Sequence, residues 1–222
     1  MKTCALVAAS DFNAEHFRRL DAQGAFDCVI AVDAGFAHLE SIGRMPDIAL
    51  GDFYSLGYVP SCRQVVRHQS KKDKSDLELA FDRAETRRYD VVYVYGALGR
   101  RLDHTLAGLQ VAALFAEKGM DITIVGDSYA VHPVVGPDAF ELPAYRAGTV
   151  SVFAATDVAR GVMERGLAYS LDDANLTNRT SLGLSNAYDG SGEPAVIAVE
   201  EGTLLVMYPL ADETSEEGSL AL

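Results

Sequence analysis

Three short segments combine acidic, basic and glycine residues in a way that suits a metal-bound polyphosphate. They are Gly51–Ser55 (Gly-Asp-Phe-Tyr-Ser), Lys72–Glu78 (Lys-Asp-Lys-Ser-Asp-Leu-Glu) and Gly96–His104 (Gly-Ala-Leu-Gly-Arg-Arg-Leu-Asp-His). Carboxylates bind Mg²⁺, basic side chains bind phosphate, and glycine allows the backbone to approach a ligand closely. Each segment follows a predicted strand or lies between two, which favours a common site.

The acids at two strand ends each have two interpretations. Asp52 follows a short strand and a glycine, so it is either a magnesium ligand or an aspartate that stabilises a turn or caps a helix. Asp33, in the run Val-Asp-Ala-Gly, either caps the next helix or faces a cleft. Both interpretations place the two acids at the ends of strands.

The Lys72–Glu78 segment has the pattern of a helix start. Ser75 and Glu78 form a capping box, which is a complete structural account of these two residues. It leaves Asp73 and Asp76 open, although the charge of Asp76 also suits the helix dipole. The cluster of lysines and aspartates over 71–76 is therefore also a candidate phosphate and metal site at a helix N-terminus.

The Gly96–His104 segment follows one predicted strand and opens a helix. Asp103 could cap that helix and His104 could lie on the surface, but neither role requires Gly96, Gly99 and Arg101 together. Arginine presents a planar fork to phosphate oxygens, so the group suits phosphate contact. The spacing matches neither a Walker A motif nor GxGxxG.

In the second half, Ser185 and Asn186 precede an Asp189-Gly190 turn signal. A β-hairpin accounts for Asp189 and Gly190. Ser185 and Asn186 remain free for another role, and a hydroxyl next to an amide can match the hydrogen-bonding edge of a heterocycle.

The hydrophobic pattern predicts two domains. Strands are predicted over 5–9, 28–32, 48–50, 65–66, 91–95 and 122–125, with helices over 14–20, 35–42, 76–88 and 103–117. This alternation predicts an α/β domain with a mostly parallel sheet over 1–126. Over 127–222 the helical periods give way to short β-rich runs separated by turn signals, at 136–138, 172–175 and 189–192, which predicts an all-β sandwich.

Composition excludes several functional classes. The net charge of −13 argues against a general nucleic-acid binder, and no apolar run approaches the roughly 20 residues of a membrane span. Part of the acidity falls in 212–217, which we expect to be a disordered tail. Three widely spaced cysteines without a CxxC pair argue against a disulfide framework or a zinc site, and favour a reducing cytoplasm.

Taken together, these motifs resemble the thiamine pyrophosphokinase (thiamine diphosphokinase) family. The resemblance covers nearly the whole chain and follows the family's order of motifs. It is carried by Ala31–Leu39, Pro46–Ser55, Lys72–Glu78, Gly96–Leu106, Gly166–Leu171 and Gly183–Asn186.

The resemblance implies an α/β domain that binds ATP and Mg²⁺, a β-sandwich that binds thiamine, and a homodimer with active sites between subunits. The reaction would transfer a diphosphoryl group from ATP to the thiamine hydroxyl, giving thiamine diphosphate and AMP. It also implies roles for individual residues: Mg²⁺ at Asp52, Asp73 and Asp76; phosphates at Lys72 and Arg101; thiamine at Tyr169, Ser185 and Asn186; and ATP or phosphate contacts at Asp33, Ser75 and Gly99.

Two points stay open under this resemblance. Either Asp76 or Asp103 could accept the hydroxyl proton, with Arg101 beside them at the reacting phosphates. In addition, Tyr54 stands where the family has a second aspartate, and Arg100 replaces a common glycine. The alternatives are therefore a diphosphokinase for another heterocyclic alcohol, such as a pterin, or a non-catalytic module that binds thiamine or nucleotide through a decayed metal site.

Overall fold

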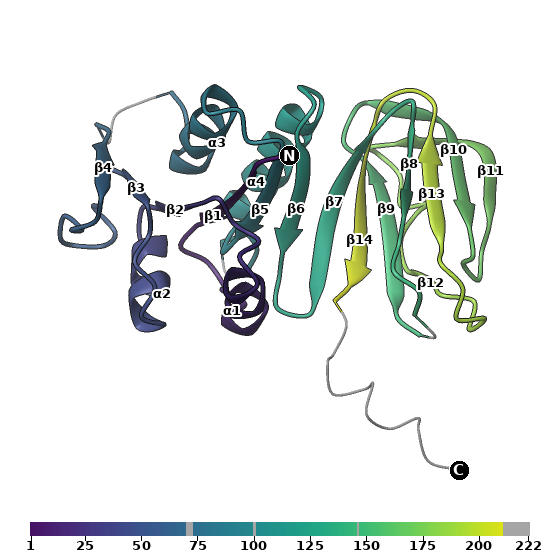
Figure 1. Ribbon diagram of the computed structural model, residues 1–222. Helices are drawn as coiled ribbons and strands as arrows, with labels where there is room; N and C mark the ends of the chain where they lie inside the picture. Colours follow the sequence, from purple (N-terminus) through teal and green to yellow (C-terminus); the bar gives the residue numbers. More distant parts are fainter. Residues whose placement is uncertain (70–72, 100, 146, 211–222) are drawn as a thin grey trace, which may run out of the picture. The chain divides into compact units, whose positions relative to one another are not determined.

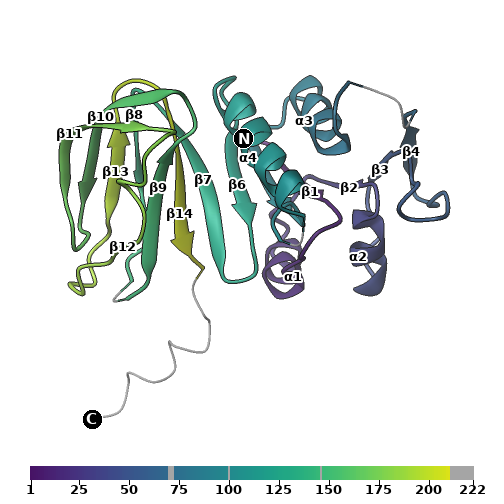
Figure 2. The ribbon, with the colours of Figure 1, turned by 180° about the vertical axis from the view of Figure 1, so that it is seen from behind.

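The computed structural model describes residues 1–69, 73–99, 101–145 and 147–210. The chain divides into two compact units, Met1–Asp127 and Ser128–Leu222 (Figures 1 and 2). Lys72, Arg100 and the acidic segment 212–217, to which the sequence assigns roles, lie outside the described residues.

The first unit alternates strands and helices. The strands are β1 (Thr3–Val7), β2 (Cys28–Val32), β3 (Ile48–Gly51), β4 (Gln64–Arg67), β5 (Val91–Tyr95) and β6 (Asp121–Val125). The helices are α1 (Ala14–Ala22), α2 (Gly35–Ser41), α3 (Asp76–Thr86) and α4 (Leu102–Ala116). Every strand pair of this unit is parallel, in the order β6-β5-β1-β2-β3-β4. The unit therefore has the α/β architecture that the sequence predicts.

Helices cover both faces of this parallel sheet. The order of strands reverses at β1, so right-handed crossovers place α1 and α2 on one face and α3 and α4 on the other (Figure 1). All five residues of β2 are buried, as the apolar run of a doubly covered strand requires. Phe81 of α3 stacks on Phe115 of α4 with ring centroids 5.0 Å apart. None of the helices in the described part of the chain has the length and apolar character of a membrane span.

The second unit consists of two antiparallel sheets. Its strands are β7 (Tyr129–Val135), β8 (Asp138–Glu141), β9 (Thr149–Ala154), β10 (Val158–Arg165), β11 (Leu171–Thr177), β12 (Asn186–Ala187), β13 (Val196–Val199) and β14 (Thr203–Pro209). One sheet runs β12-β9-β14-β7 and the other β11-β10-β13-β8. Alternate apolar residues from both sheets form one buried core, including Val152, Val162 and Val206.

One turn prediction and one hairpin prediction in this unit are wrong. The polar run Asp172–Asn175 lies inside β11, an edge strand that pairs only with β10 among the described strands and tolerates polar residues on its open side. A register shift opposite this run, with Asp173 in the left-handed region at φ 50°, marks a bulge instead of a turn. Asp189-Gly190 closes no hairpin either, because β12 pairs with β9, whereas β13 belongs to the other sheet.

Gly35 shows how tightly the helices approach the sheet. A Cβ atom on Gly35, at the start of α2, would lie 1.9 Å from the carbonyl oxygen of Val7 at the end of β1. The backbone of α2 can therefore meet β1 only if this position has no side chain.

We expect Gly35→Ala to destabilise the protein by about 2–4 kcal/mol, because the main chains of α2 and β1 would have to separate. Gly108→Ala is the matched control. It also lies in a helix, but its Cβ would make only ordinary contacts, with Leu77 Cδ2 at 3.5 Å and with Ala97 Cβ and the Ala97 carbonyl oxygen at 3.8 Å, so it should gain about 0.5–1 kcal/mol of helix propensity. Urea unfolding measures both variants, and equal stabilities would contradict the close contact.

Candidate functional site

The carboxyl ends of the parallel strands bring several predicted site residues to one edge of the first unit. Asp33 follows β2, Gly51 ends β3 and is followed by Asp52, and Gly96–Gly99 follows β5. Because α3 and α4 run back across the sheet, they begin at this same edge. In such sheets ligands bind outside the carboxyl ends of the strands, near the point where the strand order reverses.

Asp33 lies against the neighbouring strand in a restricted backbone conformation. Its φ is 49°, and its N–H donates to the Leu50 carbonyl at 2.8 Å. A Cβ on Gly51 would lie 3.0 Å from the Asp33 Cα, so the two main chains are in close contact. Among the described residues, the buried Oδ1 atom of Asp33 has no hydrogen-bond partner. The N-cap of α2 is Ala34, without a side-chain cap, so the capping interpretation of Asp33 does not apply.

Asp52 organises the turn that follows β3. Its Oδ1 accepts a hydrogen bond from the Tyr54 N–H at 2.8 Å. Between them Phe53 adopts φ 61° and is buried, whereas Tyr54 is 86% exposed. The tyrosine that replaces the expected second acid therefore points its ring into solvent and not into the strand-end site.

Ser10 and Asp11 also lie at this edge, and sequence reasoning did not assign them to the site. The Ser10 and Asp11 N–H groups donate to the carbonyls of Gly96 and Leu98, at 2.8 and 3.2 Å. A Cβ on Gly99 would lie 2.2 Å from Asp11 Oδ2 and 2.9 Å from Ser10 Oγ. The available signal was their position directly after the first strand of an alternating α/β pattern.

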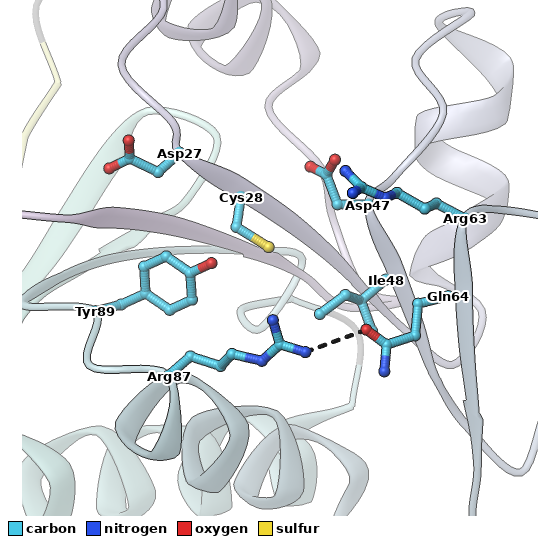
Figure 3. A pocket seen from close by; sticks show the side chains of 8 residues that line it. All are labelled: Asp27, Cys28, Asp47, Ile48, Arg63, Gln64, Arg87 and Tyr89. Carbon is cyan, nitrogen blue, oxygen red and sulfur yellow. Dashed lines mark hydrogen bonds between the residues drawn. The ribbon is translucent and has the colours of Figure 1, made fainter.

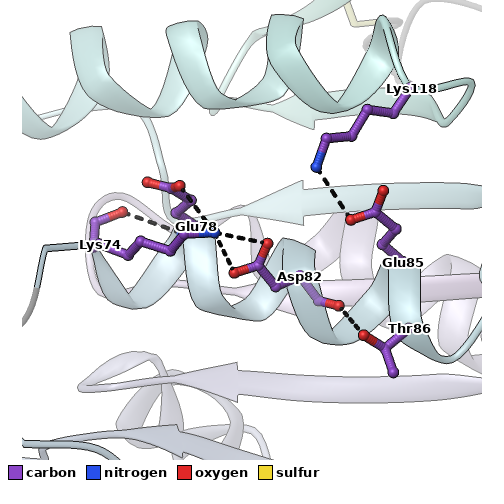
Figure 4. A network of polar contacts seen from close by, with 7 residues as sticks. Lys74, Glu78, Asp82, Glu85, Thr86 and Lys118 are labelled. Atoms are coloured by element: carbon purple, nitrogen blue, oxygen red, sulfur yellow. Dashed lines mark hydrogen bonds and ion pairs between the residues drawn. The ribbon is translucent and has the colours of Figure 1, made fainter.

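The start of α3 confirms the predicted cap but gives its lysine another role. Ser75 Oγ accepts a hydrogen bond from the Glu78 N–H at 3.1 Å. Lys74 reaches along the helix to Asp82 at 2.7 Å and to Glu78 at 3.4 Å (Figure 4). Asp76 is the first residue of α3, and the exposed Asp73 precedes the cap. The two acids thus lie at the helix N-terminus, where the dipole favours negative charge.

Arg101 and Asp103 form a two-pronged ion pair at the start of α4. Arg101 Nε donates to Asp103 Oδ1 at 2.8 Å, and its Nη2 donates to Oδ2 at 2.6 Å. Both side chains are 65% exposed. The arginine hydrogen bonds hold the pKa of Asp103 well below its usual range, so the paired carboxylate is a weak proton acceptor. Arg101 occupies the N-cap position without a side-chain cap bond.

The strand-end acids fit Mg²⁺ by their chemistry without forming a complete cage. Within the described ranges, no three histidine, cysteine or acidic side chains lie close enough to hold a metal ion. Mg²⁺ is usually held by one or two carboxylates together with substrate phosphates and water. The unpartnered Asp33 Oδ1 beside Asp52 supplies oxygen donors of this kind.

In the second unit, Asn186 is engaged inside the protein. Its Oδ1 accepts from the N–H groups of Tyr169 at 3.0 Å and Ala187 at 2.9 Å. Its Nδ2 donates to the Tyr169 carbonyl at 2.6 Å and to Glu164 Oε2 at 2.8 Å. These four bonds use the whole amide, so Asn186 holds the backbone of Tyr169, whose ring is 74% exposed.

The four hydrogen bonds of Asn186 are called the clamp below. Ser185 directly precedes Asn186 and has a constrained backbone. Its φ is 60°, and its N–H donates to Ser151 Oγ at 3.0 Å. The residue is exposed. Sequence reasoning missed both Ser151 and Glu164, because their roles depend on contacts with residues 34 and 22 positions further along the chain.

A cavity of about 450 Å³ lies at the opposite, amino-terminal edge of the first unit (Figure 3). Its acids are already used: Asp27 accepts from the Thr3 N–H at 2.8 Å, and Asp47 from the Val29 N–H at 3.0 Å. A hydrogen bond from Cys4 lowers the pKa of the Cys28 thiol to about 7. Because the acids anchor strand starts, this cavity has a structural explanation separate from the strand-end site.

Comparison with known proteins finds one family. Residues 22–124 match the family model described as thiamin pyrophosphokinase, catalytic domain. A stretch of 89 residues is 34% identical to the thiamine pyrophosphokinase of Bacillus subtilis (strain 168). That alignment covers 37% of this chain and 41% of the length of the relative.

Solved structures extend the similarity to nearly the whole chain. The crystal structure of thiamine pyrophosphokinase from Bacillus subtilis matches with a TM-score of 0.78 and 22% identity, over 95% of this chain and 100% of that chain. Thiamin pyrophosphokinase from Candida albicans matches with a TM-score of 0.73 and 13% identity, over 94% of this chain and 90% of that chain. At these identities the similarity establishes a shared fold.

The buried Glu164 yields a prediction for the pH dependence of stability. Burial raises the pKa of this carboxyl, and its hydrogen bond with Asn186 only partly opposes the shift. Between the ordinary and the raised pKa, the unfolded chain is ionised while the folded one still holds its proton, so stability falls as pH rises. We expect the melting temperature of Glu164→Gln, relative to wild type, to increase from pH 4 to pH 8. A constant difference across this range would contradict the assignment.

Proposed function

We propose that the chain is a member of the thiamin pyrophosphokinase family, whose catalytic-domain model matches residues 22–124, and that it transfers a diphosphoryl group from ATP to the hydroxyl of thiamine. The products are thiamine diphosphate and AMP. One observation carries the proposal: the matched stretch contains the strand-end acids Asp33 and Asp52 together with the starts of α3 and α4, which converge on one sheet edge.

In this proposal the two halves of the chain divide the work. Residues 1–126 bind ATP and Mg²⁺, and residues 127–222 recognise thiamine. The thiamine hydroxyl is a poor nucleophile, so positioning and neutralisation of charge dominate the rate. Acids and glycines at one edge, with two helix N-termini beside them, are an arrangement that supports both tasks.

We assign the metal to Asp52 and Asp76, with Asp73 near it. Bound Mg²⁺ would offset the charge of the triphosphate. Asp52 suits this role because it lies directly after β3, at the edge where the strand ends gather, and its Oδ1 accepts from the N–H of the exposed Tyr54. Lys72 belongs to the same proposal as a phosphate ligand, with Ser75, Gly99 and Asp33 as further ATP contacts.

In the proposed reaction, Arg101 leaves Asp103 and binds phosphate. In the structure, the guanidinium of Arg101 donates to both oxygens of Asp103. Phosphate oxygens compete for the same two-pronged donor, so ATP draws Arg101 away. Loss of this partner removes the main cause of the low pKa of Asp103 and restores its basicity. Binding of ATP would thus prepare a proton acceptor, with Asp76 as the alternative base.

Thiamine recognition is assigned to Tyr169, Ser185 and Asn186. The exposed ring of Tyr169 offers a flat surface for stacking, and the exposed Ser185 offers a hydroxyl for the pyrimidine. Asn186 acts by holding Tyr169 in place, since its amide already makes four hydrogen bonds. We further propose a homodimer in the cytoplasm. The three free cysteines support a reducing compartment.

We expect Asp52→Asn and Asp76→Asn each to lower kcat at least about 100-fold, because each removes a negative metal ligand while keeping the side-chain shape. The assay follows AMP and thiamine diphosphate formed from ATP, Mg²⁺ and thiamine. Asp121→Asn is the matched control, because Asp121 begins β6 at the opposite edge of the sheet. Circular dichroism checks that all three variants fold.

Each result of this assay has a distinct meaning. Equal amounts of AMP and thiamine diphosphate from the wild type would establish the reaction. Thiamine binding without product would favour a non-catalytic module. If the wild type neither binds thiamine nor forms product, the substrate would be another heterocyclic alcohol. Full activity of either variant would overturn the metal assignment.

Tyr54→Asp tests the decayed-site alternative. Because Tyr54 is 86% exposed and its N–H, which any residue here would keep, donates to Asp52, we expect this substitution to change kcat by less than about threefold. A gain of about tenfold or more would instead show that the native site lacks a needed carboxylate. Tyr58→Asp is a control for added charge, since Tyr58 follows nearby and is also exposed.

A further inference from the structure

Glu164 is an ionisable residue inside the second unit. It lies in β10, where its strand neighbours are Leu171 of β11 and Ile197 of β13, and it is 1% exposed. Its Oε2 accepts one hydrogen bond, from Asn186 Nδ2 at 2.8 Å. Its Oε1 is buried without a hydrogen-bond partner among the described residues.

A carboxyl group in this position is costly for folding. A buried polar atom without a partner loses its hydration and gains nothing in return, and burial of the charged form costs still more. An apolar residue would fill the same place in the sandwich at lower cost. The retained carboxyl therefore calls for an explanation beyond packing, and its only described hydrogen bond leads to Asn186.

That bond is one of four that fix which way the Asn186 amide faces. A carboxylate can only accept, so Nδ2 must point toward Glu164, and Oδ1 is left to accept from the Tyr169 and Ala187 N–H groups. If the amide flipped, Nδ2 would face these two N–H donors. Oδ1 would then face the carboxylate and the Tyr169 carbonyl. All four contacts would be mismatched.

The clamp ends at the residues assigned to thiamine. Asn186 grips Tyr169 at both its N–H and its carbonyl, which orients the exposed ring. Ser185 is the preceding residue, and its left-handed backbone depends on the placement of the same chain segment. A change in the orientation of Asn186 would move both groups together.

We propose that Glu164 is a positioning residue for thiamine recognition, which strengthens the hold on the Asn186 amide and through it helps to place Tyr169 and Ser185. This inference rests on the proposed function. It predicts that the loss of Glu164 weakens the binding of thiamine while leaving ATP binding unchanged, because the described contacts of Glu164 all lie within the second unit.

The test compares Glu164→Leu with Glu164→Gln. Leucine removes the acceptor, so we expect the thiamine KM to rise about five- to tenfold, with the ATP KM within twofold of wild type. Glutamine keeps an acceptor for Asn186 Nδ2 and should restore most of the thiamine KM. Leu176→Ala, a buried core substitution in the adjacent β11, controls for general loosening and should lower stability without changing the thiamine KM.

Amide hydrogen exchange gives a readout that does not depend on activity. In Glu164→Leu the Tyr169 and Ala187 N–H groups should exchange faster than in wild type and in Leu176→Ala. An unchanged thiamine KM in an active Glu164→Leu variant, or an equal rise in Leu176→Ala, would overturn the positioning role while the function stands. A wild type that neither binds nor converts thiamine would overturn both proposals.

Discussion

The constraint on which the first unit depends is that all its strands run in one direction. Helices must then return across both faces, which buries the strands and leaves the two edges as the places where polar groups can gather. At the carboxyl edge, Asp33, Asp52 and the starts of α3 and α4 converge. Gly35 and Gly96 allow main chains there to approach closer than a Cβ would permit, and Gly99 leaves room for the side chains of Ser10 and Asp11. The chemistry of the edge is therefore a consequence of topology.

Much of the fold could be predicted from the sequence where burial is continuous. The predicted bounds of β2 and β5 agree with the structure, because their apolar runs end abruptly at polar residues or glycine. The second unit was harder to predict. β11 contains Asp172 and Asp173, and β10 contains Gly161 and Glu164, so neither strand shows a simple alternation. These segments tolerate polar residues and glycine as strands because of an edge position and a bulge. Both features depend on pairing partners that the sequence does not reveal.

The candidate site also contains residues that could be predicted from the sequence and residues that could not. Acids that follow strands could be recognised from their place in the pattern, as could the Ser75 cap. Residues whose role depends on a distant contact could not. Lys74 is a residue of the type that binds phosphate, yet it forms ion pairs with Asp82 and Glu78. Asn186 has a side-chain amide that could bind a ligand, yet this amide forms hydrogen bonds with the backbone of Tyr169. Asp11 reaches the site only because β1 lies next to β5.

Asp33 combines a left-handed backbone with a buried oxygen that lacks a partner among the described residues. Both features are unfavourable in the chain alone, and a cation or a donor from a ligand would relieve the second by pairing with the buried oxygen. Affinity for a ligand at this edge and the stability of the fold are then opposed. A substitution that satisfied Asp33 internally would give a sturdier protein with a poorer site. Selection for thermal tolerance and selection for substrate capture would thus act on this residue in opposite directions.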